Sequence, residues 1–193
     1  MSKYITEAIR SVALVGHGAA GKTTLAEALL HAAGAIAAKG SVEKGSTVCD
    51  FDPQEKEAGH SLTSAVTNFA YEDAHIHLLD TPGYPDFAGP AIAALAAVDT
   101  ALIVINAQTG IELMTERLMR QAAERQLCRM IVINKIDADN LDLPGLVADI
   151  RNVSASSACC WICRRMARRM SSRFLSTRLA TPISNRSPPP TVP

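Results

Sequence analysis

Short apolar runs alternate with amphipathic stretches over most of this sequence. Runs with the length and composition of strands lie at residues 11–16, 64–71, 75–80, 101–105 and 130–133. Apolar residues recur at helical spacing in residues 24–33, 91–98, 112–126 and from Pro144 onward. We expect an α/β fold, because strands that alternate with helices form a mainly parallel sheet with helices on both faces. A ligand site is then expected at the carboxyl ends of the strands.

Two connections depart from this alternation. Residues 34–63 show no steady period and contain Gly, Ser, Asp and Pro, so we expect a long irregular segment. Such segments inside a compact domain are usually functional or disordered. Residues 72–74 separate two strands so closely that they predict a hairpin turn.

The first predicted strand ends in a phosphate-binding pattern. Residues 16–23 fit G-x-x-x-x-G-K-[ST], after an apolar run at 12–15 and before a helix. Glycines let main-chain N–H groups approach phosphate oxygens, and the helix N-terminus adds partial positive charge. Lys22 is expected to contact the β- and γ-phosphates, and the Thr23 hydroxyl is expected to bind Mg²⁺. The chain is therefore predicted to bind a nucleoside triphosphate.

Two further segments follow strands of the same predicted sheet. Residues 80–83, Asp-Thr-Pro-Gly, place a carboxylate at a strand end, where it can meet the metal ion of the phosphate loop. Residues 134–137, Asn-Lys-Ile-Asp, follow the fifth strand. Guanine offers two neighbouring donors that the Asp137 carboxylate can accept, whereas adenine presents an acceptor that it repels. Lys135 can lie along the base, and Asn134 can tie its loop to the phosphate loop, so GTP is predicted over ATP.

Together these segments resemble the GTP-binding domain of elongation factor G, the ribosomal translocase. The stretches that carry the resemblance are GHGAAGKTTL, QEKE before Gly59, DTPGYPDF at 80–87 and NKID at 134–137. It covers about residues 10–150 and favours the divergent elongation-factor-G-like branch. The resemblance implies a P-loop GTPase G domain that cycles between GTP and GDP with Mg²⁺ and works with the ribosome. It also implies two switch loops that sense the γ-phosphate.

The resemblance further assigns the residues of hydrolysis, with two departures from the family pattern. The first switch loop corresponds to residues 40–63, and Ser61 lies where the family usually has a Mg²⁺-binding Thr. Translocases carry His directly after DTPG to position the attacking water, but this chain has Tyr84, and a phenol is a poor base at neutral pH. Ala19 stands where many translational GTPases have Asp. Slow hydrolysis is therefore expected, with Lys22 and Tyr84 as catalytic residues and nucleotide binding intact.

The predicted site collects residues from all of these segments. The expected Mg²⁺ ligands are Thr23, Ser61 and Asp80. The expected nucleotide-binding residues are Gly16, His17, Gly18, Ala19, Ala20, Gly21, Lys22, Thr23, Thr24, Asp80, Gly83, Asn134, Lys135 and Asp137. His60, His75 and His77 have no second ligand at metal spacing, so we interpret them as structural residues of the surface or of loop ends.

The charge of the chain changes abruptly at residue 151. Residues 1–150 contain 11 Lys and Arg against 19 Asp and Glu, whereas residues 151–193 contain 8 Arg and no acidic residue, so a net charge of −8 is followed by +8. We divide the chain into a G domain at 1–151 and an Arg/Ser/Pro-rich tail at 152–193, which is disordered or an off-frame translation. On this interpretation the G domain is truncated. It lacks the later ribosome-contacting domains and a sixth strand, so the fifth strand has an unpaired edge.

Other interpretations of the tail and of the chain remain open. The tail is also compatible with a basic nucleic-acid arm, a zinc knuckle at Cys160-x-x-Cys163 or an amphipathic membrane segment near Trp161. The whole chain is compatible with a GTP-responsive module that binds RNA or the ribosome, or with a non-functional fragment, and an ATP-using enzyme is least favoured. No signal peptide or long uninterrupted apolar segment is visible, which favours a cytoplasmic protein without membrane partners. No DNA partner is expected, and Cys49 and Cys128 are predicted to be free thiols.

Overall fold

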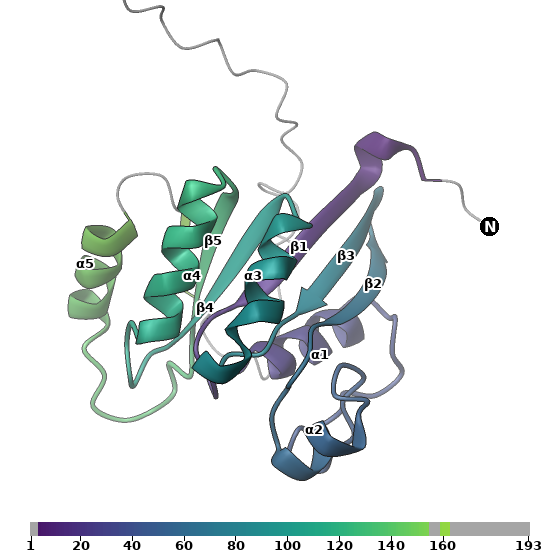
Figure 1. Cartoon of the computed structure of the whole chain (residues 1–193), viewed down its shortest axis with the longest axis horizontal. Helices are drawn as coiled ribbons and strands as arrows, with labels where there is room; N and C mark the ends of the chain where they lie inside the picture. The colour runs from purple at the N-terminus through teal and green to yellow at the C-terminus, as the bar shows by residue number, and fades with distance from the viewer. Residues whose placement is uncertain (1–3, 155–158, 163–193) are drawn as a thin grey trace, which may run out of the picture.

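A six-stranded sheet runs through the centre of the molecule (Figure 1). The computed structural model describes residues 4–154 and 159–162. The strands are β1 (Ile9–Val15), β2 (Ala65–Tyr71), β3 (Ala74–Asp80), β4 (Thr100–Asn106), β5 (Cys128–Asn134) and β6 (Cys159–Ile162). They lie in the order β2-β3-β1-β4-β5-β6, in which β2 and β3 are antiparallel and the other neighbours are parallel. The predicted mainly parallel α/β fold and its single hairpin are confirmed.

The burial of each strand follows its place in the sheet. Every residue of the central strand β4 is buried, as expected for a parallel strand covered on both faces. The edge strand β2 instead alternates, so that Ala65 and Phe69 are buried and Val66 is exposed. Because β1, β3, β4 and β5 are parallel, their carboxyl ends lie along one edge of the sheet. The three predicted nucleotide-binding segments follow β1, β3 and β5, so they all start from this edge.

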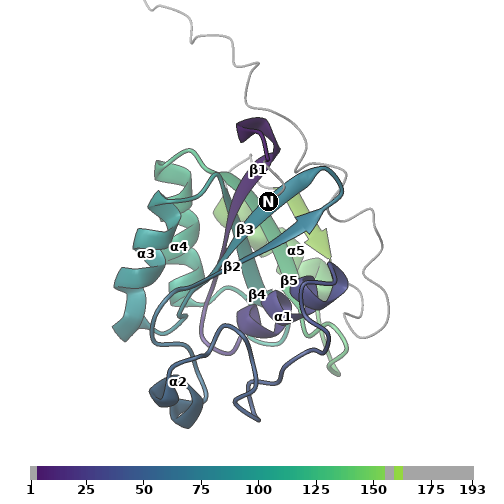
Figure 2. The same ribbon diagram turned by 90° about the vertical axis from the view of Figure 1, so that its right-hand side faces the viewer.

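Helices cover both faces of the sheet. The long helices are α1 (Lys22–Ala32), α3 (Ala88–Ala96), α4 (Leu113–Glu124) and α5 (Leu143–Ser154). α1 lies on one face, and α3 and α4 lie on the other (Figure 2). Buried Leu25 and Leu29 of α1 cluster with Val104 on the first face, while Leu95 and Leu118 belong to the cluster on the second. Leu146 and Ile150 place α5 in this second cluster as well.

The predicted irregular segment at 34–63 contains one short helix. α2 (Pro53–Ala58) begins after Asp52, whose Oδ1 accepts a hydrogen bond from the Gln54 N–H at 2.8 Å. Pro53 fits the first turn because it has no N–H to leave unpaired, and Gly59 ends the helix with a φ of 69°. The Asp-Pro start and the Gly stop were visible in the sequence, but six residues are too few to show a helical period.

The prediction that the sheet stops at the fifth strand is corrected by β6. The main chain of Cys159–Ile162 pairs in parallel with β5, in the register Met130–Cys159 to Ile133–Ile162. An open edge on β5 would leave main-chain N–H and C=O groups unpaired, and a short apolar segment after α5 satisfies them. The strand lies in the segment assigned to the tail. Cys160 and Trp161 of its candidate motifs lie in this strand, and residues 152–154 end α5. Cys163 and the remaining tail residues, with their predicted disorder, lie outside the described residues.

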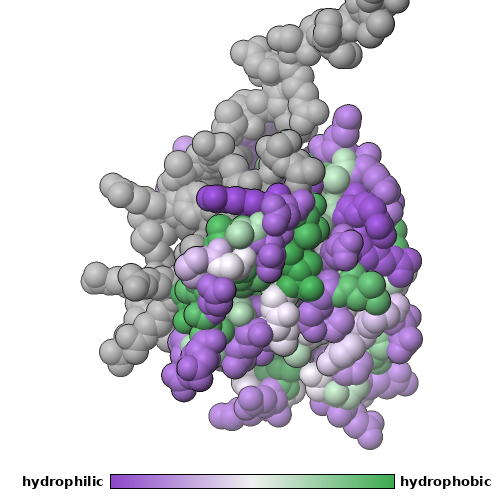
Figure 3. All heavy atoms as spheres, turned by 90° about the vertical axis from the view of Figure 1, so that its left-hand side faces the viewer, coloured by the Kyte–Doolittle hydropathy of each residue, from purple (hydrophilic) through white to green (hydrophobic). Residues whose placement is uncertain are grey.

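The outer surface is mixed in polarity. On the face that is turned left in Figure 1, hydrophobic side chains alternate with polar ones (Figure 3). Within the described residues, every helix is too short or too polar to cross a bilayer. Two short 3₁₀ turns, Thr6–Ala8 and Pro85–Phe87, complete the described secondary structure.

Candidate functional site

The phosphate-loop segment connects β1 to α1 at the carboxyl edge of the sheet. Gly16 has a φ of 144°, and a β-carbon there would collide with the carbonyl oxygen of Val104. Gly21 has a φ of 92°, and a β-carbon there would collide with the side-chain amide of Asn134. Glycine is required at both positions for two reasons. Their positive φ angles are ones that other residues rarely adopt, and there is no room for a side chain. The loop is therefore held in one shape by β4 and by the segment after β5.

The segment after β3 closes against the phosphate loop. The Thr81 hydroxyl donates to the main-chain oxygen of Leu14 at 2.6 Å, which fixes this segment to β1. A β-carbon on Gly83 would collide with the Lys22 ammonium and would lie 2.6 Å from the Gly18 nitrogen. Gly83 is thus the position at which this segment lies directly against the phosphate loop.

Lys22 and Asp80 are buried close enough in the floor of the site to influence each other electrostatically. Lys22 is 6% exposed, and its ammonium donates to the main-chain oxygen of His17 at 2.8 Å. Burial lowers the pKa of Lys22 to about 8, although the nearby Asp80 carboxylate acts in the opposite direction. Asp80 is 1% exposed, both of its carboxylate oxygens are without a hydrogen-bond partner, and burial raises its pKa to about 6. A buried carboxylate in this state is poised to bind a cation.

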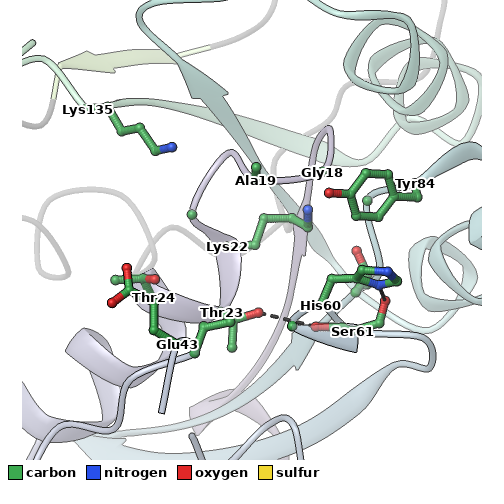
Figure 4. A pocket seen from close by; sticks show the side chains of 15 residues that line it. Gly18, Ala19, Lys22, Thr23, Thr24, Glu43, His60, Ser61, Tyr84 and Lys135 are labelled. Carbon is green, nitrogen blue, oxygen red and sulfur yellow. Dashed lines mark hydrogen bonds between the residues drawn. The ribbon is translucent and has the colours of Figure 1, made fainter. Parts of the chain in front are cut away.

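Two hydroxyl groups lie together beside this carboxylate. The Thr23 Oγ1 is 3.3 Å from the Ser61 Oγ, which brings the start of α1 into contact with the loop before β2 (Figure 4). The Ser61 hydroxyl also donates to Asp50 Oδ1 at 2.8 Å. Thr23 and Ser61 were predicted from separate parts of the chain, and the fold brings them together.

The segment after β5 contacts the phosphate loop at its other end. The Asn134 side-chain amide donates to the main-chain oxygen of Ala20 at 2.9 Å, so the predicted tie between the two loops is present. Lys135 has a φ of 57° and lines the same cavity as the phosphate loop, whereas Asp137 is exposed and lies outside the lining. Lys135 is across the cavity from His60 and Tyr84 (Figure 4).

These segments enclose a cavity of about 370 Å³, within the range of small-molecule sites. The predicted residues that line it are Gly18, Ala19, Gly21, Lys22, Thr23, Thr24, Ser61, Gly83, Tyr84 and Lys135. Predicted residues that support the cavity without lining it are Gly16, His17, Ala20, Asp80 and Asn134. The remaining lining residues, which the sequence did not predict, are Val42, Glu43, Gly59, His60 and Thr81. Most of these lie in the irregular segment before β2, where no local pattern identified individual residues.

Two buried acids that were not predicted order this irregular segment. Glu27 of α1 is fully buried and accepts the N–H groups of Gly40 and Val48 at 2.8 and 2.6 Å. Glu55 is 2% exposed and accepts the N–H groups of Leu62 and Thr63 at 2.9 and 3.0 Å. An acid flanked by apolar residues in α1 was the available signal for Glu27.

Comparison with known proteins places this arrangement in a family. The family model described as the elongation factor Tu GTP binding domain matches residues 7–176. An elongation factor G-like protein of Mycobacterium tuberculosis is 45% identical over 129 residues, which are 67% of this chain and 18% of that protein. The tetracycline resistance protein TetW of Butyrivibrio fibrisolvens is 38% identical, over 75% of this chain and 22% of that protein. The chain thus spans about a fifth of the length of these relatives.

Solved structures agree with the sequence comparison. The crystal structure of a Thermus thermophilus protein is similar with a TM-score of 0.72 and 40% identity, over 76% of this chain and 22% of that one. A bacterial selenocysteine-specific elongation factor is similar in fold, with a TM-score of 0.64 at 20% identity over 79% of this chain and 25% of that chain. The chain belongs to the family of elongation factor Tu-type GTP-binding domains and is the G domain of an elongation-factor-G-like translational GTPase.

Proposed function

We propose that this chain binds GTP and GDP with Mg²⁺ and hydrolyses GTP slowly. The observation that carries the proposal is the buried pair at the carboxyl edge of the sheet. The Lys22 ammonium contacts only a main-chain carbonyl among the described residues, and both oxygens of Asp80 lack a hydrogen-bond partner. A phosphate next to Lys22 and a cation next to Asp80 would satisfy both groups at once.

The side chains around Asp80 fit a magnesium site. Mg²⁺ prefers oxygen ligands, and Thr23, Ser61 and Asp80 supply two hydroxyls and a buried carboxylate from three segments. In a bound nucleotide complex the ion neutralises charge on the β- and γ-phosphates. Thr23 and Ser61 would hold the ion directly, and Asp80 would hold it directly or through its water shell. Lys22 would stabilise the charge that develops on the γ-phosphate.

The segment after β5 supports selection of guanine. Asn134 holds this segment on the phosphate loop, and Lys135 lines the cavity at the end opposite His60 and Tyr84. Asp137, two residues further on, would accept hydrogen bonds from the ring N–H and the exocyclic amine of guanine. Adenine lacks this pair of donors, so GTP is bound in preference to ATP.

Tyr84 and Ala19 support a low rate of hydrolysis. Tyr84 lines the cavity at the position where the resemblance to translocases places a water-positioning His. Ala19 adds a methyl group to the phosphate loop where an Asp would add a charge. We further propose that residues 1–151, completed by β6 at the edge of β5, make up the G-domain unit. The resemblance to translational GTPases supports a cytoplasmic protein with the ribosome as its partner.

Calorimetry of the full chain with Mg²⁺ tests the proposed function. GTP and GDP are expected to bind, and ATP is expected to bind at least about a hundredfold more weakly. Asp137→Asn is expected to weaken GTP binding and to favour XTP, because xanthine presents a carbonyl where guanine presents an amine. Asp86→Asn is the control, since Asp86 is an exposed carboxylate of the turn at Pro85–Phe87. Equal binding of ATP and GTP, or no effect of Asp137→Asn, would contradict the proposal.

A further inference from the structure

A histidine of the irregular segment lies in the wall of the proposed nucleotide cavity. His60 is located between α2 and β2, next to Ser61, and it lines the cavity together with Lys22, Gly83 and Tyr84. Its ring centroid lies 4.7 Å from that of Tyr84, with the two planes inclined at 58°. It is also 6.0 Å from the ring of Phe87. Aromatic contacts on one side therefore hold the imidazole at the Lys22 end of the cavity (Figure 4).

The hydrogen-bonding state of His60 leaves one nitrogen for a ligand. Its Nδ1 lies 3.4 Å from the main-chain oxygen of Ser61, and a carbonyl oxygen only accepts, so Nδ1 carries the proton in this contact. In the neutral ring Nε2 is then an acceptor. Among the described residues Nε2 has no hydrogen-bond partner, so the nitrogen is available to a water molecule in the cavity.

The other two aromatic groups at this end are used differently. His17 contacts the start of α4. Its Nε2 lies 3.4 Å from Glu112 Oε1, and its main-chain N–H donates to Thr115 Oγ1 at 3.2 Å. The Tyr84 ring covers Gly18 so closely that a β-carbon on Gly18 would lie 2.7 Å from it. Tyr84 thus packs between the phosphate loop and His60, and its phenol is a weak acceptor for a water proton.

We propose that His60 is the catalytic residue that orients the hydrolytic water, and that Tyr84 acts by holding His60 in place. This inference rests on the proposed function. The water oxygen forms a bond to the γ-phosphorus while the bond from that phosphorus to the bridging oxygen breaks, giving GDP and inorganic phosphate. His60 Nε2 accepts a hydrogen bond from the water and so directs its lone pair, and the water's proton leaves with the phosphate. The irregular segment before β2 thereby supplies the water-orienting imidazole that the segment after β3 lacks.

Single-turnover GTP hydrolysis by the full chain tests the role of His60. His60→Ala is expected to slow hydrolysis roughly tenfold to a hundredfold while the Kd values for GTP and GDP stay within about twofold. His60→Gln is expected to restore part of the rate, because a glutamine oxygen also accepts from water. Tyr84→Phe keeps the ring that packs against His60 and is expected to slow hydrolysis less than His60→Ala does. The matched control is His31→Ala, which removes an exposed histidine from the last turn of α1.

A second readout does not depend on turnover. GDP with aluminium fluoride mimics the transferring phosphoryl group, so it is expected to bind the wild type and Tyr84→Phe more tightly than GDP alone, and His60→Ala no more tightly than GDP alone. An unchanged rate in His60→Ala, a larger loss in Tyr84→Phe, or no measurable hydrolysis by the wild type would overturn the inference while the proposed GTP binding stands. Failure of GTP to bind in calorimetry would overturn both.

Discussion

Two glycines with left-handed main chains have different surroundings in this structure. Gly21 ends the phosphate loop with a φ of 92°, and a β-carbon there would collide with the Asn134 side chain. Gly34 follows α1 with a φ of 72°, and nothing lies within 4 Å of its β-carbon position. A side chain would strain the main chain at both positions, whereas close contact with another segment of the chain is specific to Gly21. Substituting each glycine in turn therefore distinguishes the effect of main-chain strain on stability from the effect of the Asn134 contact on nucleotide binding.

Substitution of these two glycines gives a prediction about nucleotide affinity. Gly34→Ala is expected to lower the free energy of unfolding by about 1–2 kcal/mol and to leave GTP affinity unchanged. Gly21→Ala is expected to weaken GTP binding about tenfold or more, which is about 1.4 kcal/mol, because Asn134 must leave Ala20 to make room. Urea unfolding and calorimetry measure the two quantities. Equal losses of affinity in both variants would show that the contact with Asn134 does not matter.

The segment before β2 is held by acidic side chains that were not part of the predicted site. Glu27 of α1 accepts hydrogen bonds from the N–H groups of Gly40 and Val48, in the first half of this segment. Glu55 of α2 accepts hydrogen bonds from N–H groups near the end of the segment. Asp50 accepts from the hydroxyls of Thr47 and Ser61, both at 2.8 Å. Hydrogen bonds to charged acceptors are stronger than neutral ones, so these three acids determine the position of Ser61 and of the loop around it.

The reactivity of the buried Cys49 thiol provides a measure of how firmly this segment is held. Cys49 is 2% exposed, and burial raises the pKa of its thiol, with the neighbouring Asp80 and Glu27 carboxylates adding to the effect. Glu27→Gln removes one main-chain anchor and one negative charge, and both changes favour the Cys49 thiolate. We expect iodoacetamide at pH 8 to modify Cys49 roughly tenfold faster in this variant.

Peptide mapping by mass spectrometry follows each cysteine separately in this experiment. The exposed Cys128 lies at the start of β5, away from the segment, and serves as the internal control with an unchanged rate. If Cys49 reacts at the same rate in Glu27→Gln and in the wild type, Glu27 does not anchor the segment.

Two apolar layers stabilise the molecule as a whole. The layer under α3, α4 and α5 contains fully buried Leu118, whereas Leu113 at the start of the same helix is 72% exposed. Both are leucines of α4, so they differ in burial and not in chemistry. The layer also supports β5, which leads into the proposed base-binding segment, so its packing bears on the site as well as on stability.

A leucine pair on α4 tests this layer. Leu118→Ala is expected to lower the free energy of unfolding by about 2–5 kcal/mol, because it removes apolar contacts and leaves a cavity. Leu113→Ala is expected to change it by less than about 0.5 kcal/mol, because the side chain already lies in water. Urea denaturation followed by circular dichroism measures both. Similar losses in the two variants would contradict the assignment of α4's buried face.

Much of the sheet was predictable from local patterns. The buried strands β1, β4 and β5 are short apolar runs, and the predicted bounds differ from the observed ones by a few residues. The phosphate loop follows β1, and Asp80 and Asn134 end β3 and β5, so their common edge also followed from the parallel arrangement. β6 and α2 were not predicted, because four or six residues carry too little periodicity and their stability comes from the edge of β5 and from a capping aspartate.

Residues that are neighbours in the sequence determined the order of strands and helices, the phosphate loop and the predicted guanine-binding segment. Their chemistry depends on spacing within a turn or a strand, which the sequence displays directly. The burial of Glu27, the meeting of Thr23 with Ser61 and the position of His60 beside Tyr84 depend on segments that are many residues apart. Such contacts arise from chain packing, in which the irregular segment folds back over α1. The phosphate loop was therefore visible in the sequence, whereas the side chains that complete the cavity around it required the folded chain.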